Sequence, residues 1–483
     1  MIDDAPETTP QPSLRRDVQR NRAQLIDAAR SLLAQHPQAS MAAISEAAGL
    51  GRNTIYRHFP NRDAMIAAVR GDSSDASGPA EERDRLRPAG ELANVSPTPM
   101  SVWDVLNKVA PFQLGVQIVA EAQRLPGVSA AALYLVDLDG LSLQRMAGPE
   151  SFPKTLEIQL AVGPEIDRHA MPRVRADIQA LMPAVSVAPL DLRGRAMGVL
   201  LVVGSDSPGL RELAQEAAAA LAVAEQFTGV PGRVRRTRET SPAAELQQSL
   251  LPPRIVRIGG AMLAANLIPS DQAFGDWFDY TDDPEQSWLG ILDMQGRGLR
   301  STAISAAVMA AFRAARYREG ATPATATHLM HETLLALSDH PPTASATIAT
   351  WNSATSLLHW VTCGDNVPLL YDGDVQPLGK DAQPRLGAPE FPKQLRIQSR
   401  RLRPGERVLF VSDGITGRLD DVGGQPFGID GVAAALRGRV ISSAAEILRA
   451  IQDAALAHSI GPVTDDATLM VLAPNAPTDA PAV

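Results

Sequence analysis

The sequence contains one cysteine, Cys363, among 483 residues. A single thiol excludes a disulfide framework within the chain and any cysteine-rich metal site. No hydrophobic run approaches the roughly 18 residues of a membrane-spanning helix, and residues 197–203, among the longest, are typical of a strand. The N-terminus is acidic and proline-rich, so we expect no signal peptide. Together these absences predict a cytoplasmic protein without membrane association.

The overall charge also excludes an extensive nucleic-acid-binding surface. The net charge of −9 argues against such a surface over the whole protein. The charge is uneven, however, because residues 14–70 contain nine arginines against four acidic residues, a local net charge of +5. This asymmetry predicts a small DNA-binding module on an acidic remainder.

Length and composition predict several domains. A chain of 483 residues is too long for one hydrophobic core, and its 38 prolines and 36 glycines indicate linkers. We expect domains at residues 14–72, 101–228 and 243–474, with linkers at 73–100 and 229–242. In the middle domain the pattern predicts a helix over 105–123, a strand at 130–136, a hairpin of 185–190 with 196–203, and a helix over 210–227.

The first domain has the pattern of three short helices. Apolar residues recur with a helical period over residues 21–35, Ser40 can cap a second helix, and Gly49-Leu50-Gly51 makes a tight turn before a third. Residues 25–69 resemble the DNA-binding half of TetR-type repressors. The matching segments are Ile26-Asp27-Ala28-Ala29-Arg30, Ile44-Ser45-Glu46-Ala47-Ala48-Gly49 and Thr54-Ile55-Tyr56-Arg57-His58-Phe59.

This resemblance implies an all-α helix-turn-helix domain whose third helix enters the major groove. The residues expected near that DNA surface are Arg52, Asn53, Thr54, Tyr56, Arg57 and His58. The residues expected in its core are Ile44, Ala47, Ile55 and Phe59. A three-helix interaction module without DNA affinity is the alternative. TetR-type repressors normally continue into an all-helical dimerising domain, and no such pattern follows here, so dimerisation must come from elsewhere or a half-site is bound weakly.

The middle domain, residues 101–228, resembles a GAF sensor domain of the α/β class. The resemblance depends on Pro189-Leu190-Asp191-Leu192-Arg193-Gly194-Arg195-Ala196-Met197-Gly198-Val199-Leu200 and on the long helix that follows. It implies an unknown small-molecule ligand. His169, the only histidine in the domain, is expected to be an ordinary residue and not a haem ligand. The apolar face of residues 213–227 either pairs with a second copy of the chain or packs against the sheet.

Acidic residues lie at the ends of predicted buried strands in the C-terminal part. Asp293 and Asp413 each follow an apolar run, Asp465-Asp466 precede another, and Asp276 lies in Phe274-Gly275-Asp276-Trp277-Phe278-Asp279. A buried unpaired carboxylate is costly, so several at strand ends predict a shared cation. Oxygen ligands favour magnesium or manganese over zinc, and two such ions form a phosphate-cleaving site.

Residues 243–474 resemble the SpoIIE-like branch of the PPM metal-dependent protein phosphatases. The matching segments, in family order, are Leu246-Gln247-Gln248-Ser249-Leu250-Leu251-Pro252, Gly275-Asp276-Trp277-Phe278-Asp279, Asp293-Met294-Gln295-Gly296-Arg297-Gly298, Leu386-Gly387, Leu402-Arg403-Pro404-Gly405-Glu406, Ser412-Asp413-Gly414, Phe427-Gly428 and Asp465-Asp466-Ala467-Thr468. The resemblance implies an α/β fold, a β-sandwich flanked by helices, that binds two Mn²⁺ or Mg²⁺ ions.

The resemblance also implies a role for each acidic residue. Asp293 is expected to bridge both ions, and Asp276 with the carbonyl of Met294 to complete one shell. Asp413 and Asp465 are expected to hold the other ion, with Asp466 as the alternative to Asp465. Asp279 and Asp466 could instead be caps or strand-end turns.

Three departures from the family pattern leave the extent of activity open. Phe274 replaces a glycine, Arg297 replaces a histidine, and Asp365 replaces the histidine of a family Ala-Gly-His-Asn segment. None of them removes an expected metal ligand. Arg297 either binds the substrate phosphate through its planar guanidinium or crowds the site. His328 and His331 match ligand spacing on a predicted helix, but a solvated helix face is the expected reading.

The sequence therefore predicts a multidomain, metal-dependent serine/threonine protein phosphatase with a GAF-like sensor and a DNA-binding module. Its substrate, by analogy with the family, would be a phosphorylated anti-sigma-factor antagonist. The helix at residues 243–251 is expected to control metal binding, and the chain is expected to form a homodimer. The alternative is a one-component transcription regulator whose phosphatase-like domain is catalytically degenerate.

Overall fold

The computed structural model describes the chain in two compact units, residues 1–96 and 97–483. In the first unit the described residues are 24–33, 39, 43–44, 47–49, 65 and 69. In the second they are 102–204, 208–270, 275–338, 340–379, 382–439 and 441–475. Among these residues no helix combines the length and hydrophobicity needed to cross a membrane.

The first unit buries a small hydrophobic core. Residues 24–33 are helical, as the periodicity predicted, and Leu25 and Ala29 from this helix are buried with Ile44 and Met65. Ala47 was expected in this core but is exposed, while Ala48 packs against it. One residue along a helix turns the side chain by about 100°, so the two alanines face different directions. The predicted DNA-contacting residues Arg52, Asn53, Thr54, Tyr56, Arg57 and His58, together with Ile55 and Phe59, lie outside the described residues.

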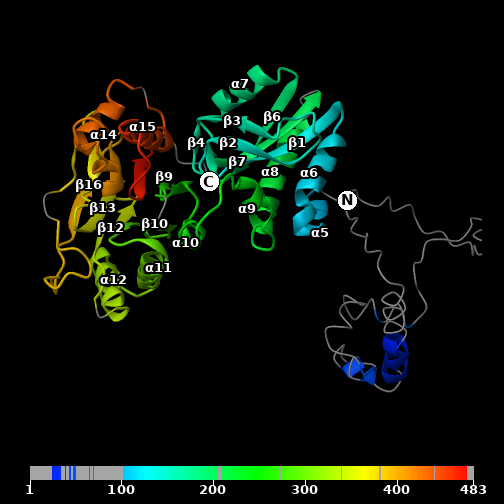
Figure 1. Ribbon diagram of the computed structural model, residues 1–483, viewed down its shortest axis with the longest axis horizontal. Helices are drawn as coiled ribbons and strands as arrows, with labels where there is room; N and C mark the ends of the chain where they lie inside the picture. The colour runs from blue at the N-terminus through cyan, green and yellow to red at the C-terminus, as the bar shows by residue number, and fades with distance from the viewer. Residues whose placement is uncertain are drawn as a thin grey trace, which may run out of the picture. The chain divides into compact units, whose positions relative to one another are not determined.

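The middle domain contains a seven-stranded antiparallel sheet (Figure 1). Its strand order is β3-β2-β1-β7-β5-β4, and β6 also pairs with β7. The strands are β1 (Val128–Val136), β2 (Ser142–Ala147), β3 (Thr155–Glu157), β4 (Ala161–Val162), β5 (Glu165–Asp167), β6 (Val185–Leu192) and β7 (Arg195–Gly204). The predicted β6–β7 hairpin is confirmed, and its turn places Arg193 and Gly194 at φ 54° and 88°, the left-handed region that glycine favours.

Helices cover both faces of this sheet. They are α5 (Val102–Lys108), the 3₁₀ turn η1 (Pro111–Gln113), α6 (Leu114–Gln123), α7 (Met171–Leu181) and α8 (Pro208–Ala224). Alternate residues of β1 point to opposite faces: Leu133 packs with α6 and α8, and Tyr134 packs with α7. The single helix predicted for residues 105–123 was wrong, because the chain breaks at residues 109–110, just before Pro111, whose ring disfavours helix in the preceding residue.

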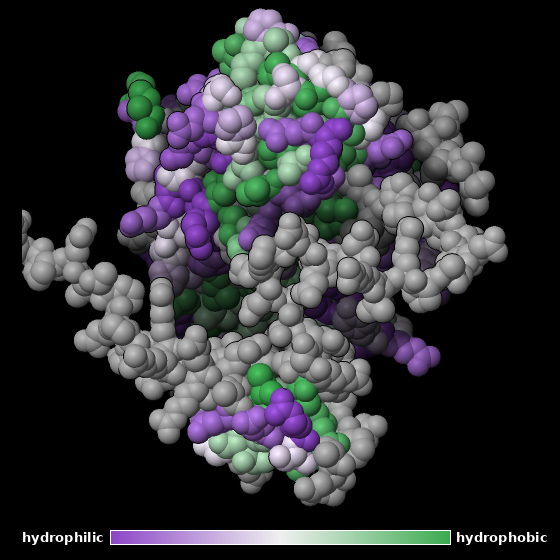
Figure 2. Space-filling model, turned by 90° about the vertical axis from the view of Figure 1, so that its right-hand side faces the viewer, coloured by the Kyte–Doolittle hydropathy of each residue, from purple (hydrophilic) through white to green (hydrophobic). Residues whose placement is uncertain are grey.

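Helix α8 resolves one alternative left open by the sequence. Its buried residues Leu213 and Leu221 pack against the sheet, so this apolar face serves the core of the domain. Large hydrophobic side chains are nevertheless exposed elsewhere in the domain, among them Phe112, Val116 and Phe227. Figure 2 shows one face of the molecule on which hydrophobic and hydrophilic residues are both exposed.

The C-terminal domain is a sandwich of two antiparallel sheets, of order β10-β11-β12-β13-β16 and β15-β14-β17-β18-β9-β8 (Figure 1). The strands are β8 (Ile255–Ile258), β9 (Ala261–Ile268), β10 (Trp277–Asp282), β11 (Ser287–Met294), β12 (Ala344–Asn352), β13 (Leu357–Cys363), β14 (Leu369–Tyr371), β15 (Val375–Pro377), β16 (Gln398–Arg401), β17 (Arg407–Val411) and β18 (Ala467–Pro474). Side chains from both sheets, such as Leu289 and Phe410, form one core between them.

Helices cover the outer faces of the sandwich. They are α10 (Pro242–Leu250), α11 (Gly298–Ala315), α12 (Pro323–Ala336), the short α13 (Asp413–Thr416), α14 (Gly428–Leu436) and α15 (Ala444–Ala457). Helices α11 and α12 pack on the first sheet, and α14 and α15 on the second. Strand β11 is buried at every position, because it has the sandwich core on one face and α11 on the other. The predicted β-sandwich flanked by helices is confirmed.

The segment at residues 229–242 is more ordered than the predicted linker. It contains helix α9 (Val230–Arg235), with Pro231 near its start, where proline is well tolerated. The carbonyl of Arg235 accepts a hydrogen bond from the Leu138 N–H at 3.1 Å. Val162 of β4 belongs to the hydrophobic cluster beneath α15. The middle and C-terminal domains are therefore packed against each other within one compact unit.

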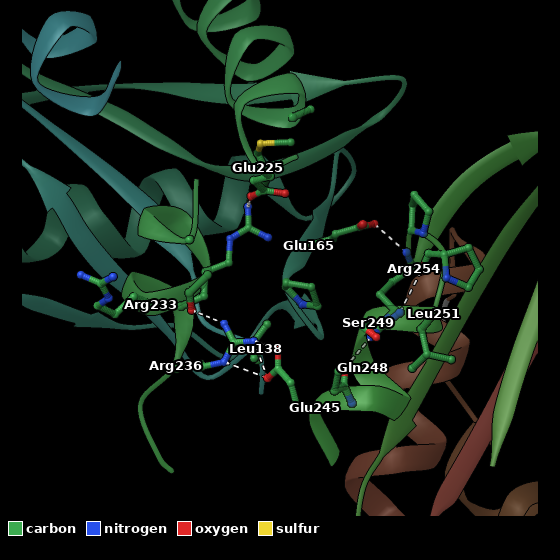
Figure 3. A pocket seen from close by; sticks show the side chains of 18 of the residues that line it. Leu138, Glu165, Glu225, Arg233, Arg236, Glu245, Gln248, Ser249, Leu251 and Arg254 are labelled. Atoms are coloured by element: carbon green, nitrogen blue, oxygen red, sulfur yellow. Dashed lines mark hydrogen bonds and ion pairs between the residues drawn. The ribbon is translucent and has the colours of Figure 1, made fainter. Parts of the chain in front are cut away.

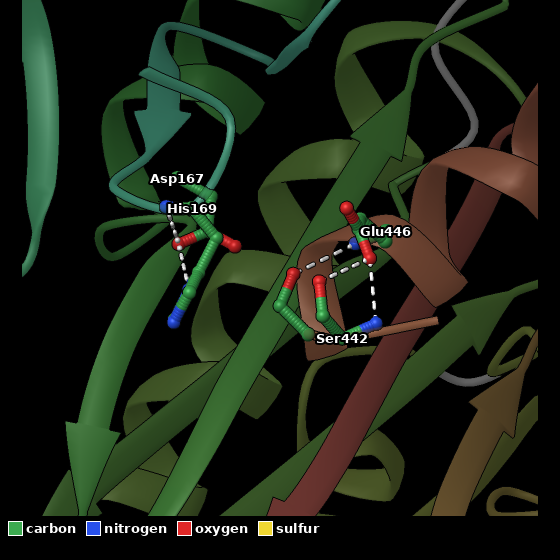
Figure 4. Close-up of polar contacts among 5 residues, drawn as sticks. Asp167, His169, Ser442 and Glu446 are labelled. Atoms are coloured by element: carbon green, nitrogen blue, oxygen red, sulfur yellow. Dashed lines mark hydrogen bonds and ion pairs between the residues drawn. The ribbon is translucent and has the colours of Figure 1, made fainter. Parts of the chain in front are cut away.

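Figure 4 shows two separate carboxylate contacts, one at the start of α15 and one at the end of β5. Ser443 caps α15 by accepting from the Glu446 N–H, and the Glu446 carboxylate accepts from the N–H and hydroxyl of Ser442 at 2.7 and 2.8 Å. In the middle domain, the ring of His169 lies 3.2 Å from the carboxylate of Asp167. This contact agrees with an ordinary structural role for His169.

Candidate active site

Four acidic residues from separate segments converge near one end of the sandwich. Asp276 directly precedes β10, Asp293 lies near the end of β11, Asp413 opens α13, and Asp465 lies just before β18. Their proximity is seen in their mutual electrostatic effects. Negative charge on Asp293 raises the pKa of Asp276, and Asp413 raises the pKa of both Asp293 and Asp465. The tertiary fold thus brings acids from segments nearly 190 residues apart into electrostatic contact.

Asp276 is buried in the structure at 1% exposure. One carboxylate oxygen accepts a hydrogen bond from the Thr468 hydroxyl at 2.8 Å, and the other has no hydrogen-bond partner. Burial, then the charges of Asp293 and Asp466, raise the pKa of Asp276 well above its ordinary value. The site therefore contains a buried carboxylate oxygen that a cation could satisfy.

Asp293 and Asp413 are closely coupled. Burial, the charge of Asp413 and a hydrogen bond between the two side chains raise the pKa of Asp293 to about 8. One oxygen of Asp293 is buried without a hydrogen-bond partner. Burial and the charge of Asp413 also raise the pKa of Asp465 to about 6. A cluster of acids that repel one another in this way is stabilised by protons or by cations.

Asp466 has a different environment from Asp465. Its carboxylate accepts hydrogen bonds from the N–H groups of Ser270 at 2.9 Å and Gly275 at 3.1 Å, and from the side chain of Gln247 at 2.5 Å. Asp466 thus fixes the loop that carries Asp276, while Asp465 stays half-buried beside Asp413. Of the two carboxylates, that of Asp466 is the one engaged by several protein donors.

Two glycines allow close backbone approach in this site. A Cβ atom added to Gly414 would lie 2.0 Å from the carbonyl oxygen of Asp466. Gly275 adopts φ 102° and packs against α11, where its carbonyl accepts a hydrogen bond from the Ser305 hydroxyl. At position 414 only glycine fits without displacing the backbone, because a side chain there would meet the carbonyl of Asp466.

Helix α10 reaches the same site through Gln247. The side-chain amide of Gln247 donates to the carbonyl of Asp276 at 3.0 Å as well as to Asp466, and Gln247 is 2% exposed. The sequence predicted this helix as a control element but assigned no role to Gln247. A glutamine on the buried face of an amphipathic helix was the available signal, because a buried amide needs partners.

Asp279 pairs with two arginines in the structure. It is 2% exposed and accepts from Arg313 at 2.9 Å, and Arg316 lies 3.3 Å away. Arg313 also donates to the carbonyl of Leu250 at 2.8 Å, at the end of α10. Arg313 of α11 therefore links Asp279 of β10 to the end of α10.

Arg297 lies at the edge of the acid cluster. It precedes α11, and its positive charge partly opposes the rise in the pKa of Asp465 that burial and Asp413 cause. A cavity of about 720 Å³ adjoins it, also lined by Arg300, Ser301 and His340. This places a cavity with two arginines next to the acids.

Arg385 is a further residue near the site that sequence reasoning missed. Its guanidinium pairs with Asp365, and its charge opposes the raised pKa of Asp293. Asp365, noted as a departure from the family pattern, therefore holds an arginine that faces the acids. No local sequence pattern around Arg385 predicts this contact, because the contact joins segments that are distant in sequence. Phe274 lies outside the described residues.

The predicted histidine pair does not lie on a solvated face. The His331 ring stacks on Phe391 with 3.9 Å between ring centroids and accepts a hydrogen bond from the Gly387 N–H at 3.0 Å. His328 contacts the same phenylalanine edge-on. Both rings are partly buried because Phe391 covers α12, which the local sequence does not show.

The donor set fits hard cations, though it is not a preformed cage. Carboxylate oxygens suit Mn²⁺ or Mg²⁺, and Asp276 and Asp293 each offer an unpartnered oxygen. In the part of the chain that the structure describes, no three His, Cys, Asp or Glu side chains are spaced to enclose an ion.

Comparisons with known families assign a class to two parts of the chain. Residues 25–69 match the model of bacterial regulatory proteins of the tetR family, and residues 283–475 match that of stage II sporulation protein E, SpoIIE. The chain thus carries one segment similar to the tetR family and one similar to SpoIIE.

A curated relative supports the first assignment. The HTH-type transcriptional repressor LfrR of Mycolicibacterium smegmatis is 40% identical over 65 residues, which is 14% of this chain and 34% of the repressor. The chain therefore spans only about a third of that repressor's length.

Solved structures of similar architecture accompany the second assignment. The SiaA-PP2C domain of Pseudomonas aeruginosa is 20% identical with a TM-score of 0.39, covering 44% of this chain and 84% of that one. The RsbU and RsbW domains of Rv1364c from Mycobacterium tuberculosis are 23% identical with a TM-score of 0.38, covering 46% and 63%. The SpoIIE phosphatase domain with a regulatory fragment from Bacillus subtilis is 12% identical with a TM-score of 0.38, covering 75% and 88%.

Proposed function

We propose that this chain is a Mn²⁺- or Mg²⁺-dependent protein serine/threonine phosphatase. The observation that supports the proposal best is the convergence of Asp276, Asp293, Asp413 and Asp465, whose charges raise one another's pKa values. An acid cluster this costly without cations is expected where cations bind.

Each residue of the site would have its own role. Two hard cations held by these acids would supply Lewis-acid chemistry for the hydrolysis of a phosphate ester. Asp293 would hold both ions, Asp276 and the Met294 carbonyl one of them, and Asp413 and Asp465 the other. Arg297 would bind the substrate phosphate with its planar guanidinium. Gln247 would keep the Asp276 loop in place.

The wider role proposed here follows from the combination of modules. The TetR-like module would bring the phosphatase to DNA, and the middle domain would act as a GAF-like sensor of an unidentified small molecule. The substrate would be a phosphorylated anti-sigma-factor antagonist, as the family resemblance implies. Such a protein would act in the cytoplasm, as a homodimer.

A second candidate is a transcription regulator with a degenerate phosphatase domain. It is favoured by the absence, within the described residues, of three acidic or histidine side chains spaced to enclose an ion. It is also favoured by Arg297, which stands where the family has a histidine. In this case the acid cluster would be a relic.

Metal titration and turnover decide between the two candidates. For the enzyme, we expect calorimetric Mn²⁺ binding and Mn²⁺-dependent hydrolysis of a phosphoserine peptide and of p-nitrophenyl phosphate. The variant Asp293→Asn should lose both, while the matched control Asp177→Asn, at an exposed position on α7, should keep both. DNA retention with neither metal binding nor turnover in the wild type would establish the regulator instead.

A further inference from the structure

A pocket lies where the middle domain, α9 and α10 meet (Figure 3). Its volume is about 860 Å³, within the range of small-molecule sites. Residues from β5, β7 and α8 line one side, and the segment from α10 to Arg254 lines another. The pocket is distinct from the acid cluster, since none of Asp276, Asp293, Asp413 or Asp465 lines it.

Ion pairs surround this pocket and leave an excess of positive charge. Arg195 lies 3.1 Å from Glu165, Arg235 lies 3.1 Å from Glu225, and Arg236 pairs with Glu245 at 2.5 Å. Figure 3 shows Arg236 and Glu245 on one side and Glu165 with Arg254 on the other. Arg233 and Arg254 also line the pocket, so five arginines face three glutamates, a net charge of +2.

Two of these arginines have donors that the protein leaves unused. Arg235 and Arg254 are only 9% and 5% exposed, and the Nε–H of each has no hydrogen-bond partner in the structure. A buried guanidinium donor without an acceptor is unfavourable unless something supplies the acceptor. Because both residues line the pocket, an anion there would supply the acceptor once the side chain turns toward it.

The remaining walls are apolar. They are formed by Leu138, Pro164, Met197, Ala222, Leu251, Pro252 and Pro253. A site with guanidinium donors and apolar walls suits a ligand that has an anionic group joined to a larger, less polar part.

We propose that this pocket binds a small organic phosphate of about mononucleotide size. A phosphate monoester carries about −1.5 to −2 charges at neutral pH, which matches the excess of two positive charges, and its oxygens suit the guanidinium fork. The non-phosphate part of the ligand contacts the apolar walls.

The pocket is also connected to α10. Glu165 accepts from the N–H groups of Arg254 and Ile255 at 3.0 and 2.8 Å, and Arg254 donates to Gln248 at 2.8 Å. Gln248 adjoins Gln247, which holds the Asp276 loop. Arg254 therefore connects the pocket, through Gln248, to α10 and the Asp276 loop. Any effect of the ligand on phosphatase turnover rests on the proposed function, whereas binding of the ligand to the pocket does not.

The test is calorimetry on the full-length chain in metal-free buffer, with AMP as the probe. Adenosine lacks the phosphate, and citrate is a control anion without the nucleoside. We expect AMP to bind and the other two to bind at least tenfold more weakly, since each lacks one half of the recognition. Citrate binding as tight as AMP binding, or no heat from AMP, overturns the proposal.

Substitutions locate the binding in this pocket. Arg233→Ala removes an exposed pocket charge, and we expect it to weaken AMP binding roughly fivefold. Arg235→Lys keeps the charge but loses the Nε donor, and we expect roughly tenfold weaker binding with an unchanged circular dichroism spectrum. Arg211→Ala, an exposed arginine of α8 outside the pocket, is the matched control and should bind normally. Wild-type affinity in both pocket variants refutes the site.

The variant Asp293→Asn separates AMP binding in the pocket from the proposed phosphatase activity. This variant should bind AMP as the wild type does, because Asp293 does not line the pocket. Normal AMP binding in a protein that hydrolyses no phosphopeptide would sink the proposed enzyme and support the pocket. Loss of AMP binding in Asp293→Asn alone would place the AMP at the acid cluster and overturn the pocket.

Discussion

Replacing Asp293 by Asn should stabilise the metal-free protein while abolishing its response to Mn²⁺. Burial and the charges of Asp413 and Asp465 raise the pKa of Asp293 from 3.8 to about 8. The folded state therefore favours the protonated acid. The associated stability is fully present below the unfolded pKa of about 3.8 and is lost as the pH rises through about 8.

The size of the effect follows from the same shift. At pH 7 the difference from the unfolded pKa is about three units, or ~4 kcal/mol at ~1.4 kcal/mol per unit, shared among the repelling acids. Asparagine removes the charge but still buries a polar amide, so we expect the free energy of unfolding to rise by a net ~2 kcal/mol at pH 7. In a domain of this size that gain raises the melting temperature by roughly 5 °C.

The assay is thermal unfolding of wild type and Asp293→Asn in chelator at pH 4, 6 and 8, repeated with Mn²⁺. The two proteins should melt alike at pH 4 and diverge by pH 8, where Mn²⁺ should stabilise only the wild type. An Asp293→Asn variant that is less stable than the wild type at pH 8 without metal would refute the reasoning. So would equal stabilisation of both proteins by Mn²⁺.

Three further substitutions test the surroundings of the acids. Gln247→Met removes the donors to Asp276 and Asp466, and we expect roughly tenfold lower turnover and weaker Mn²⁺ binding in calorimetry, with secondary structure retained. Unchanged turnover would show that α10 does not control the site. Gly414→Ala would place a Cβ 2.0 Å from the Asp466 carbonyl, so denaturant unfolding should show a loss of about 2 kcal/mol or more, whereas Gly229→Ala, where no atom lies within 4 Å, should be nearly neutral. Asp279→Asn leaves the buried Arg316 without its counter-charge and should cost ~3 kcal/mol in unfolding while leaving Mn²⁺ affinity intact. Loss of Mn²⁺ binding in that variant would make Asp279 a ligand after all.

Much of the fold could be predicted from local patterns. The β6–β7 hairpin follows from the apolar runs around Arg193-Gly194, and buried strands at β11, β17 and β18 follow from short apolar runs next to acids. The predictions failed where a single residue decides the outcome. The break before Pro111 and the choice of Ala48 over Ala47 for the core are both of this kind.

The sequence by itself determined which acids lie at strand ends and that their ligand chemistry favours hard cations, because side-chain type and strand periodicity are local properties. Only the tertiary structure decided that Asp279 pairs with arginines, that Gln247 and Arg385 approach the acids, and that arginines of the middle domain border a pocket. Such contacts join segments far apart in the chain. Their partners are selected by packing and by the need to neutralise buried charge, and no local pattern records that selection.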